Sequence, residues 1–259
     1  MKKTALIIMI LTIVSKIVGF AREISLSYLY GASYISDAYL ISITIPGVIF
    51  GFIVAGLGAG YIPMYSKIQQ IEGELEANRF TNNIINILFV IGTGVILMGF
   101  LFTEQIVRLF ALGFEGETLA LTVQFTKISL FSLYFTGMVS IFSGYLQIKG
   151  NYIIPALIGL PLNFFIILSI VISPFTDISV LAVGYVIAIG SSLFFMIPYM
   201  RKNKYRYKAI LDFKDKHISN MAVIVMPLIL GVSAGQINLM VDRSIASQLA
   251  VGAISAIRS

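Results

Sequence analysis

The segment SKIVGFAREI at positions 15–24 places charged side chains in a run that is otherwise apolar enough to cross a bilayer. A charged side chain at the centre of a membrane helix costs roughly 2.5–3.5 kcal/mol, so such residues normally face water or one another. Helical spacing puts Lys16, Gly19 and Glu23 at i, i+3 and i+7, and Arg22 falls on the adjoining strip. The segment therefore predicts a polar stripe, centred on a glycine, that faces an aqueous cavity.

The lipid headgroup region is an alternative environment for these charged side chains. Lysine and arginine near a helix end can reach back to the lipid headgroups at little cost. This alternative is strongest for Lys16. Gly31 ends the apolar run soon after Arg22 and Glu23, so this pair could also lie in the outer third of the bilayer.

The composition is that of an all-α polytopic membrane protein. Of the 259 residues, 58% are hydrophobic, and the mean hydropathy of +0.94 excludes an ordinary soluble protein. Without cysteine the chain has no disulfide and no cysteine-based metal site. The single histidine, His217, is flanked by charged residues and is expected in a solvated loop. The Lys2-Lys3 start lacks a small-residue cleavage site before the charged stripe, which indicates a retained first helix.

Seven hydrophobic segments are long enough to span a bilayer, at about 20 residues each. They lie near 4–30, 36–65, 81–102, 118–147, 152–173, 178–200 and 219–249. We expect three parts: a six-helix lobe at 1–200, a basic cytoplasmic linker at 201–216, and a seventh helix at 217–259 that begins a truncated second lobe. A short helix on the outer surface is expected at 102–110.

The basic residues predict the orientation. With the N-terminus in the cytoplasm, the inner connections carry most of the lysines and arginines, whereas the outer connections carry Arg108 alone. This asymmetry follows the positive-inside rule. It also accounts for the net charge of +6 without a nucleic-acid partner.

The second segment is punctuated by residues that weaken a helix. These are Pro46, Gly47, Gly51, Gly56, Gly58, Gly60 and Pro63. Prolines remove backbone hydrogen bonds, so a broken or hinged helix is expected, although close packing through small-xxx-small spacing could also explain the glycines. At its start, Ser36 is expected to cap the helix, with Asp37 favoured near the positive end of the helix dipole. A substrate or ion contact is the alternative for Asp37.

Two further cations fall within predicted spans. Lys127 follows Gln124 by three residues, close to the middle of the fourth span, and a role in the cavity competes with reaching outward. Arg243 lies in the seventh segment among other polar residues. A shift of 221 positions aligns Arg22 with Arg243 and Gly31 with Gly252, as a parallel repeat of a six-helix unit would.

Six short motifs follow one another along the chain: SKIVGFARE at 15–23, GA at 31–32, SDAY at 36–39, AGYIP at 59–63, PLILGVS at 227–233 and DR at 242–243. With these motifs in this order, the sequence resembles the MurJ (MviN) family of lipid II flippases in the MOP superfamily. The resemblance implies a bacterial plasma-membrane transporter, with a six-helix lobe that faces a second lobe across a cationic cavity. The implied substrate is a polyprenyl-pyrophosphate-linked peptidoglycan precursor, carried outward by alternating access.

By position, the resemblance matches Lys16 to a basic site of the family, Arg22 to its central arginine and Asp37 to its acidic site. The sequence departs from the family pattern in two ways. Where members often carry arginines after the proline of the second helix and an acid before its glycine, this chain has Val48-Ile-Phe50 and Val54-Ala55. The chain also ends within the seventh helix motif. These departures leave three readings open: an exporter of another polyprenyl-linked saccharide, another MOP-superfamily transporter, or a non-transporting fragment.

No enzyme motif competes with transport. The sequence has no P-loop, no HExxH motif and no paired acids at catalytic spacing, so no cofactor is expected. The candidate substrate-binding residues are Lys16, Arg22, Glu23, Asp37, Lys127 and Arg243. The expected partners are the lipid-linked precursor, membrane lipids, and a second lobe or a second copy of the chain.

Overall fold

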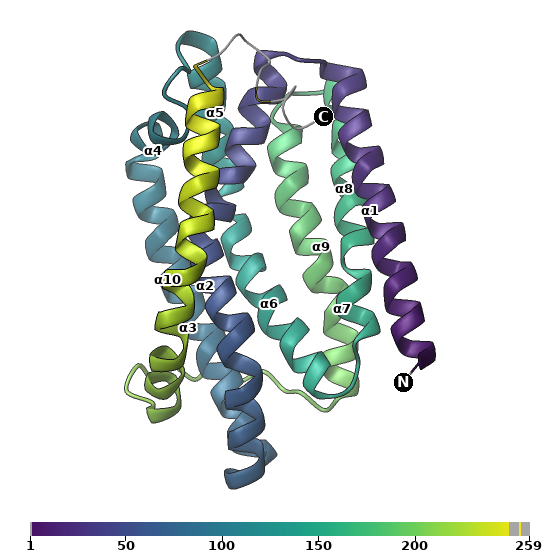
Figure 1. Cartoon of the computed structure of the whole chain (residues 1–259), viewed down its shortest axis with the longest axis vertical. Helices are drawn as coiled ribbons and strands as arrows, with labels where there is room; N and C mark the ends of the chain where they lie inside the picture. Colours follow the sequence, from purple (N-terminus) through teal and green to yellow (C-terminus); the bar gives the residue numbers. More distant parts are fainter. Residues whose placement is uncertain (1, 249–253, 255–259) are drawn as a thin grey trace.

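The computed structural model describes residues 2–248 and residue 254, and within these it is a bundle of helices (Figure 1). The predicted end of the seventh segment beyond Gln248, apart from Ile254, lies outside the described residues. The elements are α1 (Lys2–Tyr30), α2 (Tyr34–Glu72), α3 (Glu74–Leu101), α4 (Thr103–Phe110), α5 (Gly116–Ser129), α6 (Ser132–Ile148), α7 (Ile153–Leu157), α8 (Gly159–Ile172), η1 (Ser173–Phe175), α9 (Val180–Lys202) and α10 (Lys216–Ala246).

The predicted all-helical membrane architecture is confirmed. Five helices, Ile153–Phe175 being taken as one, are long and apolar enough to cross a membrane, and two bent helix pairs bring the number to seven. The bends are 43° between α5 and α6 and 58° within α10, directly after Pro227. The fourth segment is therefore not the single straight span that hydropathy predicts. The short helix expected at 102–110 is found as α4.

Helix α2 corrects two expectations. It runs without a break through Pro46 and Pro63, so it is not a broken helix in this conformation. Its N-cap is Ser33 and not Ser36: the Ser33 hydroxyl accepts from the backbone N–H of Ser36, while the Ser36 hydroxyl accepts from the N–H of Ser33. This reciprocal capping box satisfies two donors that the first turn leaves free.

The bundle has two ends, which we name by what they carry. The N-terminus and the connection between α9 and α10 (residues 203–215, the linker) lie at the linker end, and α4 lies at the α4 end (Figure 1). The basic connections predicted to be cytoplasmic thus share one end with the N-terminus.

The core is organised around α2, which contacts α10, α5, α6 and α3. Its aromatic side chains Phe50, Tyr61 and Tyr65 are at most 1% exposed. The Tyr61 hydroxyl lies 2.9 Å from the Thr81 hydroxyl of α3, so its polar atom is satisfied within the apolar core.

Asparagines of α3 hold the linker against the bundle. The Asn83 side chain accepts from the N–H of Asp212 and donates to the carbonyl of Asp212, both at 2.8 Å. Asn86 donates to the carbonyl of Ile210 at 2.8 Å. The linker is therefore fixed along α3.

His217 is not a solvated loop residue. It lies in the first turn of α10 and is 7% exposed, packed edge-on against Phe80. Its Nε2 is 3.4 Å from a Glu72 carboxylate oxygen. Its neighbour Lys216 approaches the same carboxylate group, at 3.5 Å, but its side chain remains exposed.

Candidate functional site

The uncharged residues of the polar stripe on α1 pack against another helix, whereas its charged residues stay at least partly exposed. Ser15 and Gly19 face α8, where the Asn163 amide lies 3.7 Å from the position a Cβ on Gly19 would take. A Cβ on Gly159 would come within 2.1 Å of the Ser15 hydroxyl oxygen. Small residues on both helices therefore let α1 and α8 approach closely. The glycine at the centre of the stripe lies at this contact between the two helices.

The charges of the stripe remain partly accessible. Arg22 and Glu23 form an ion pair, with their side chains 22% and 24% exposed. Because the two charges offset one another, the pair costs less within lipid depth than an isolated arginine would. Lys16 is exposed.

Asp37 lies in the first turn of α2 and is 3% exposed. An acidic side chain there interacts favourably with the positive end of the helix dipole, as the simpler prediction had it.

Lys127 and Arg243 share a different local feature. The bend between α5 and α6 leaves Lys127 in the last turn of α5, and Arg243 lies in the last turn of α10. A cation in the last turn of a helix is stabilised by the negative end of the dipole. Lys127 is exposed, whereas its neighbour Gln124 donates to the Ser179 hydroxyl at 2.8 Å.

The six predicted charged residues lie between the α4 end and the middle of the bundle. Counted at about 1.5 Å per residue along each helix, Asp37 and Arg243 are roughly 5 Å from the helix end there, and Arg22 roughly 12 Å. Lys127 is roughly 17 Å and Lys16 roughly 21 Å from the same end. They come from four helices. Helix α10 packs against α2, whereas α1 packs against α8 and lies on the opposite side of the bundle from α10 (Figure 1).

Sequence reasoning missed a cavity inside the bundle. A space of about 450 Å³ lies between α2, α6, α8 and α9. From α2 it is lined by Pro46, Gly47 and Gly58, and from α6 by a row of polar side chains: Ser132, Thr136, Ser140, Ser143 and Gln147. The spacing of this row, at i, i+4, i+8, i+11 and i+15, marks one face of a helix and was readable in the sequence. None of the six charged residues lines this cavity.

The glycines of α2 serve two purposes. A Cβ on Gly47 or Gly58 would meet no atom within 4 Å. A Cβ on Gly56 or Gly60 would come within 2.2 and 2.5 Å of the two methyl groups of Val225 on α10. Gly51 likewise lies against the Gln236 side chain of α10, at 3.0 Å. Three of the five glycines thus allow α10 to pack on α2, and two lie beside the cavity.

Comparison with known proteins gives a consistent result. The sequence matches the family described as "Lipid II flippase MurJ" over residues 26–259. A protein of Aquifex aeolicus (strain VF5) named "Probable lipid II flippase MurJ" is 29% identical over 249 residues, which is 94% of this chain and 48% of that protein. A "Lipid II flippase MurJ" of Thermosipho africanus is 28% identical over 79% of this chain and 42% of its own.

Solved structures agree with the sequence matches. A structure described as "Lipid II flippase MurJ, inward closed conformation" superposes with a TM-score of 0.81 at 26% identity, and the match covers 98% of this chain and 53% of that one. A multidrug resistance MATE transporter of the MOP superfamily superposes with a TM-score of 0.73 at 14% identity, which shows a shared fold alone.

The chain spans about half the length of the curated relatives it matches. Its several apolar helices are those of a multi-pass bacterial membrane protein. Because the family match takes in residues 26–259, nearly the whole chain, this protein belongs to the MurJ lipid II flippase family.

Proposed function

We propose that this chain forms the N-terminal half of a lipid II flippase, which moves a polyprenyl-pyrophosphate-linked peptidoglycan precursor across the bacterial plasma membrane. The observation that carries the proposal is the match to the MurJ family over residues 26–259, with a TM-score of 0.81 to a MurJ structure. The activity is transport without a chemical step, and it needs no cofactor.

The physical problem is the headgroup. A pyrophosphate cannot cross about 30 Å of hydrocarbon unaided, because its charge would lose its hydration. Cations inside the membrane would replace that hydration by charge-assisted hydrogen bonds. We assign this role to Arg22, Lys16, Lys127 and Arg243. Arginine suits it best, since its planar guanidinium binds two phosphate oxygens at once.

The ion pair on α1 suggests how substrate binding is controlled. In this conformation the Arg22 guanidinium is engaged by Glu23. A pyrophosphate would compete with that carboxylate for the same donors. Asp37, buried at the start of α2, supplies further negative charge at the α4 end. We propose that both acids keep the cations from holding the substrate too tightly.

Alternating access requires part of the lobe to move. The residues proposed to act as the hinge are Pro46, Gly47, Gly51, Gly56, Gly58 and Gly60. Gly47 and Gly58 suit this role best, because they border an open cavity into which α2 could bend. Helix α10 would move together with α2, because it packs against Gly51, Gly56 and Gly60. We place the linker end in the cytoplasm, as its basic connections favour.

The test is complementation in bacteria depleted of their own flippase. The chain is expressed alone, and also as a chimera in which it replaces the matching half of the Aquifex aeolicus relative. Rescue of growth, with lipid II reaching the outer leaflet where a membrane-impermeant reagent detects it, supports the proposal. A well-folded, membrane-inserted chimera that exports a different polyprenyl-linked saccharide, or none, contradicts it.

The site is tested in the same chimera. Arg22→Ala is expected to abolish rescue, whereas Arg108→Ala, which removes an exposed cation of α4, is expected to leave it intact. Equal rescue by both variants at equal expression would show that Arg22 does not bind the substrate.

A further inference from the structure

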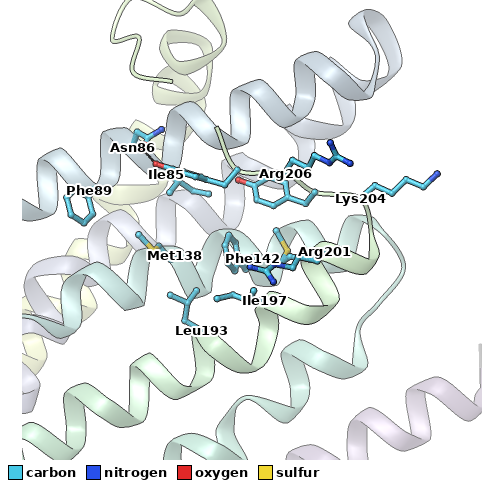
Figure 2. A pocket seen from close by; sticks show the side chains of 13 residues that line it. Ile85, Asn86, Phe89, Met138, Phe142, Leu193, Ile197, Arg201, Lys204 and Arg206 are labelled. Atoms are coloured by element: carbon cyan, nitrogen blue, oxygen red, sulfur yellow. Dashed lines mark hydrogen bonds between the residues drawn. The ribbon is translucent and has the colours of Figure 1, made fainter. Parts of the chain in front are cut away.

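A second cavity has no part in the proposed transport route. It has a volume of about 1160 Å³ and lies at the linker end, between α3, α6, α9 and the linker (Figure 2). None of the six charged candidate residues lines it. Ligand pockets for ordinary small molecules measure about 300–1,000 Å³, so this cavity has room for a long-chain ligand.

The wall of the cavity is apolar. Side chains from three helices form it: Ile85 and Phe89 of α3, Met138 and Phe142 of α6, and Leu193, Ile197 and Met200 of α9. Phe89 is 49% exposed, and large apolar side chains of α3 such as Leu97 remain exposed farther along that helix. The cavity therefore opens at a surface suited to lipid acyl chains.

The rim of the cavity is cationic. Arg201, Lys204 and Arg206 gather at one end of the cavity, away from Phe89 and Leu193 (Figure 2). All three are exposed, and within the described part of the chain none of them forms an ion pair. Three uncompensated positive charges beside an apolar wall form an amphipathic site.

The position of Lys204 is conformationally unusual. Its φ is +61°, and no other non-glycine among the described residues has a positive φ. It follows the end of α9, where the N–H of Lys204 bonds the carbonyl of Arg201 at 3.0 Å and the N–H of Tyr205 bonds that of Met200 at 3.1 Å. This is a Schellman motif, in which glycine normally occupies the left-handed position. Here a lysine occupies it and adds a cation to the rim.

The linker that carries this rim is held in place. The Tyr205 ring packs against Phe142 and Tyr145, and its hydroxyl donates to the Asn82 side chain at 2.6 Å. The Tyr207 hydroxyl donates to the Asn86 side chain at 2.5 Å. The cations are thus attached to an ordered backbone and not to a mobile loop.

We propose that this cavity binds an anionic diacyl phospholipid from the leaflet at the linker end. An acyl chain lies along Phe89, Met138 and Leu193, and the phosphate lies among Arg201, Lys204 and Arg206. Basic pockets between membrane helices on the cytoplasmic side suit such headgroups. A phosphodiester is favoured over the polyprenyl-pyrophosphate substrate because the cavity lies apart from the charges of α1 and α10. The site requires membrane insertion only, so it stands whether or not the chain flips lipid II.

Fluorescence quenching can test the site, because the chain contains no tryptophan. Phe89→Trp places a single reporter at the cavity, and Phe164→Trp, 59% exposed on α8, reports on bulk lipid. Each variant is reconstituted in phosphatidylcholine vesicles in which either brominated phosphatidylglycerol or brominated phosphatidylcholine is present at the same mole fraction. We expect the phosphatidylglycerol-to-phosphatidylcholine quenching ratio to exceed 1 at position 89 and to equal 1 at position 164.

A matched pair of triple variants then tests the rim. R201Q/K204Q/R206Q is expected to weaken phosphatidylglycerol binding on the order of 100-fold, since each of the three cations near anionic lipid contributes about 1 kcal/mol. K202Q/K208Q/K214Q removes the same charge from the same end without touching the cavity, and it is expected to keep the affinity. K204G should weaken binding while leaving the melting temperature in detergent unchanged or higher, because glycine relieves the left-handed conformation.

Three outcomes would overturn the proposal. The first is a quenching ratio of 1 at both reporter positions. The second is an equal loss of binding in the two triple variants, which would mean general attraction to the charged end. The third is displacement of the brominated lipid by polyprenyl phosphate at amounts where unlabelled phosphatidylglycerol has no effect, which would assign the cavity to the isoprenoid carrier.

Discussion

The contact between α2 and α10 predicts opposite effects for two neighbouring glycines. Val225 of α10 places one methyl group against Gly56 and the other against Gly60. A Cβ on Gly56 would come within 2.2 Å of the Val225 Cγ1, whereas a Cβ on Gly58 would meet no atom within 4 Å. Carbon atoms prefer separations of about 3.5–4.0 Å, so Gly56→Ala forces the helices apart or Val225 out of its rotamer.

The magnitudes follow from two opposing terms. Overpacking costs about 1–3 kcal/mol. Replacing a helical glycine by alanine gains about 0.5–1 kcal/mol through backbone entropy. Gly56→Ala should therefore destabilise the protein by about 1–2 kcal/mol, and Gly58→Ala should stabilise it by up to about 1 kcal/mol. At about 2–4 °C per kcal/mol, we expect melting temperatures lower by about 2–8 °C and higher by about 1–4 °C, respectively.

Val225→Ala provides the decisive double-mutant cycle. In the native background it loses two buried methyl groups, at about 0.8 kcal/mol each. In the Gly56→Ala background it removes the clash, so this cost should vanish and a coupling energy of at least about 1 kcal/mol should appear. Melting temperatures of detergent-solubilised variants, followed by size-exclusion chromatography after heating, measure all four corners. If Gly56→Ala proves as stable as Gly58→Ala, or if Val225→Ala costs the same in both backgrounds, the packing is not as described.

Three further predictions concern other contacts. Burial raises the pKa of the Tyr205 hydroxyl above its usual value of 10.0, so its contribution to stability is complete below about pH 10 and is lost as the pH rises toward the folded-state pKa. Tyr205→Phe should therefore reduce the fall in melting temperature between pH 9 and 11. An unchanged fall would exclude Tyr205 as its source. Asn83→Ala should leave the Asp212 N–H unsatisfied at a cost of about 1–3 kcal/mol and speed tryptic cleavage of the linker, whereas native-like cleavage would show that the asparagine does not hold it. Gly159→Ala should lower the melting temperature through a clash with the Ser15 hydroxyl, and Ser15→Gly should restore it; failure of that rescue would place the clash elsewhere.

Sequence reasoning succeeded where a property is local. A run of about 20 apolar residues is sufficient for a membrane helix, so the seven segments and the short helix at 103–110 were predictable. The dipole at the start of α2 likewise favours Asp37 there, whatever surrounds it. The bend between α5 and α6 was not predicted, because no proline or glycine marks Leu130 and Phe131.

Sequence reasoning failed where a residue has a neighbour on another helix. His217 stands among charged residues in the chain, yet it is buried, because the turn of α10 directs it toward Phe80. Asn83 belongs to no motif in the sequence, but it holds the linker through Asp212. Neither contact could be read from spacing within one helix.

The sequence by itself determined the membrane class, the positions of the spans and the family, because hydropathy and short motifs are properties of the chain alone. Only the tertiary structure decided which glycine packs and which borders a cavity. Gly56 and Gly58 are two residues apart and chemically identical, but the helical turn points one at Val225 and the other away from it. The environment of a residue inside a bundle depends on the helix that lies opposite, and that helix is chosen by the packing of the whole.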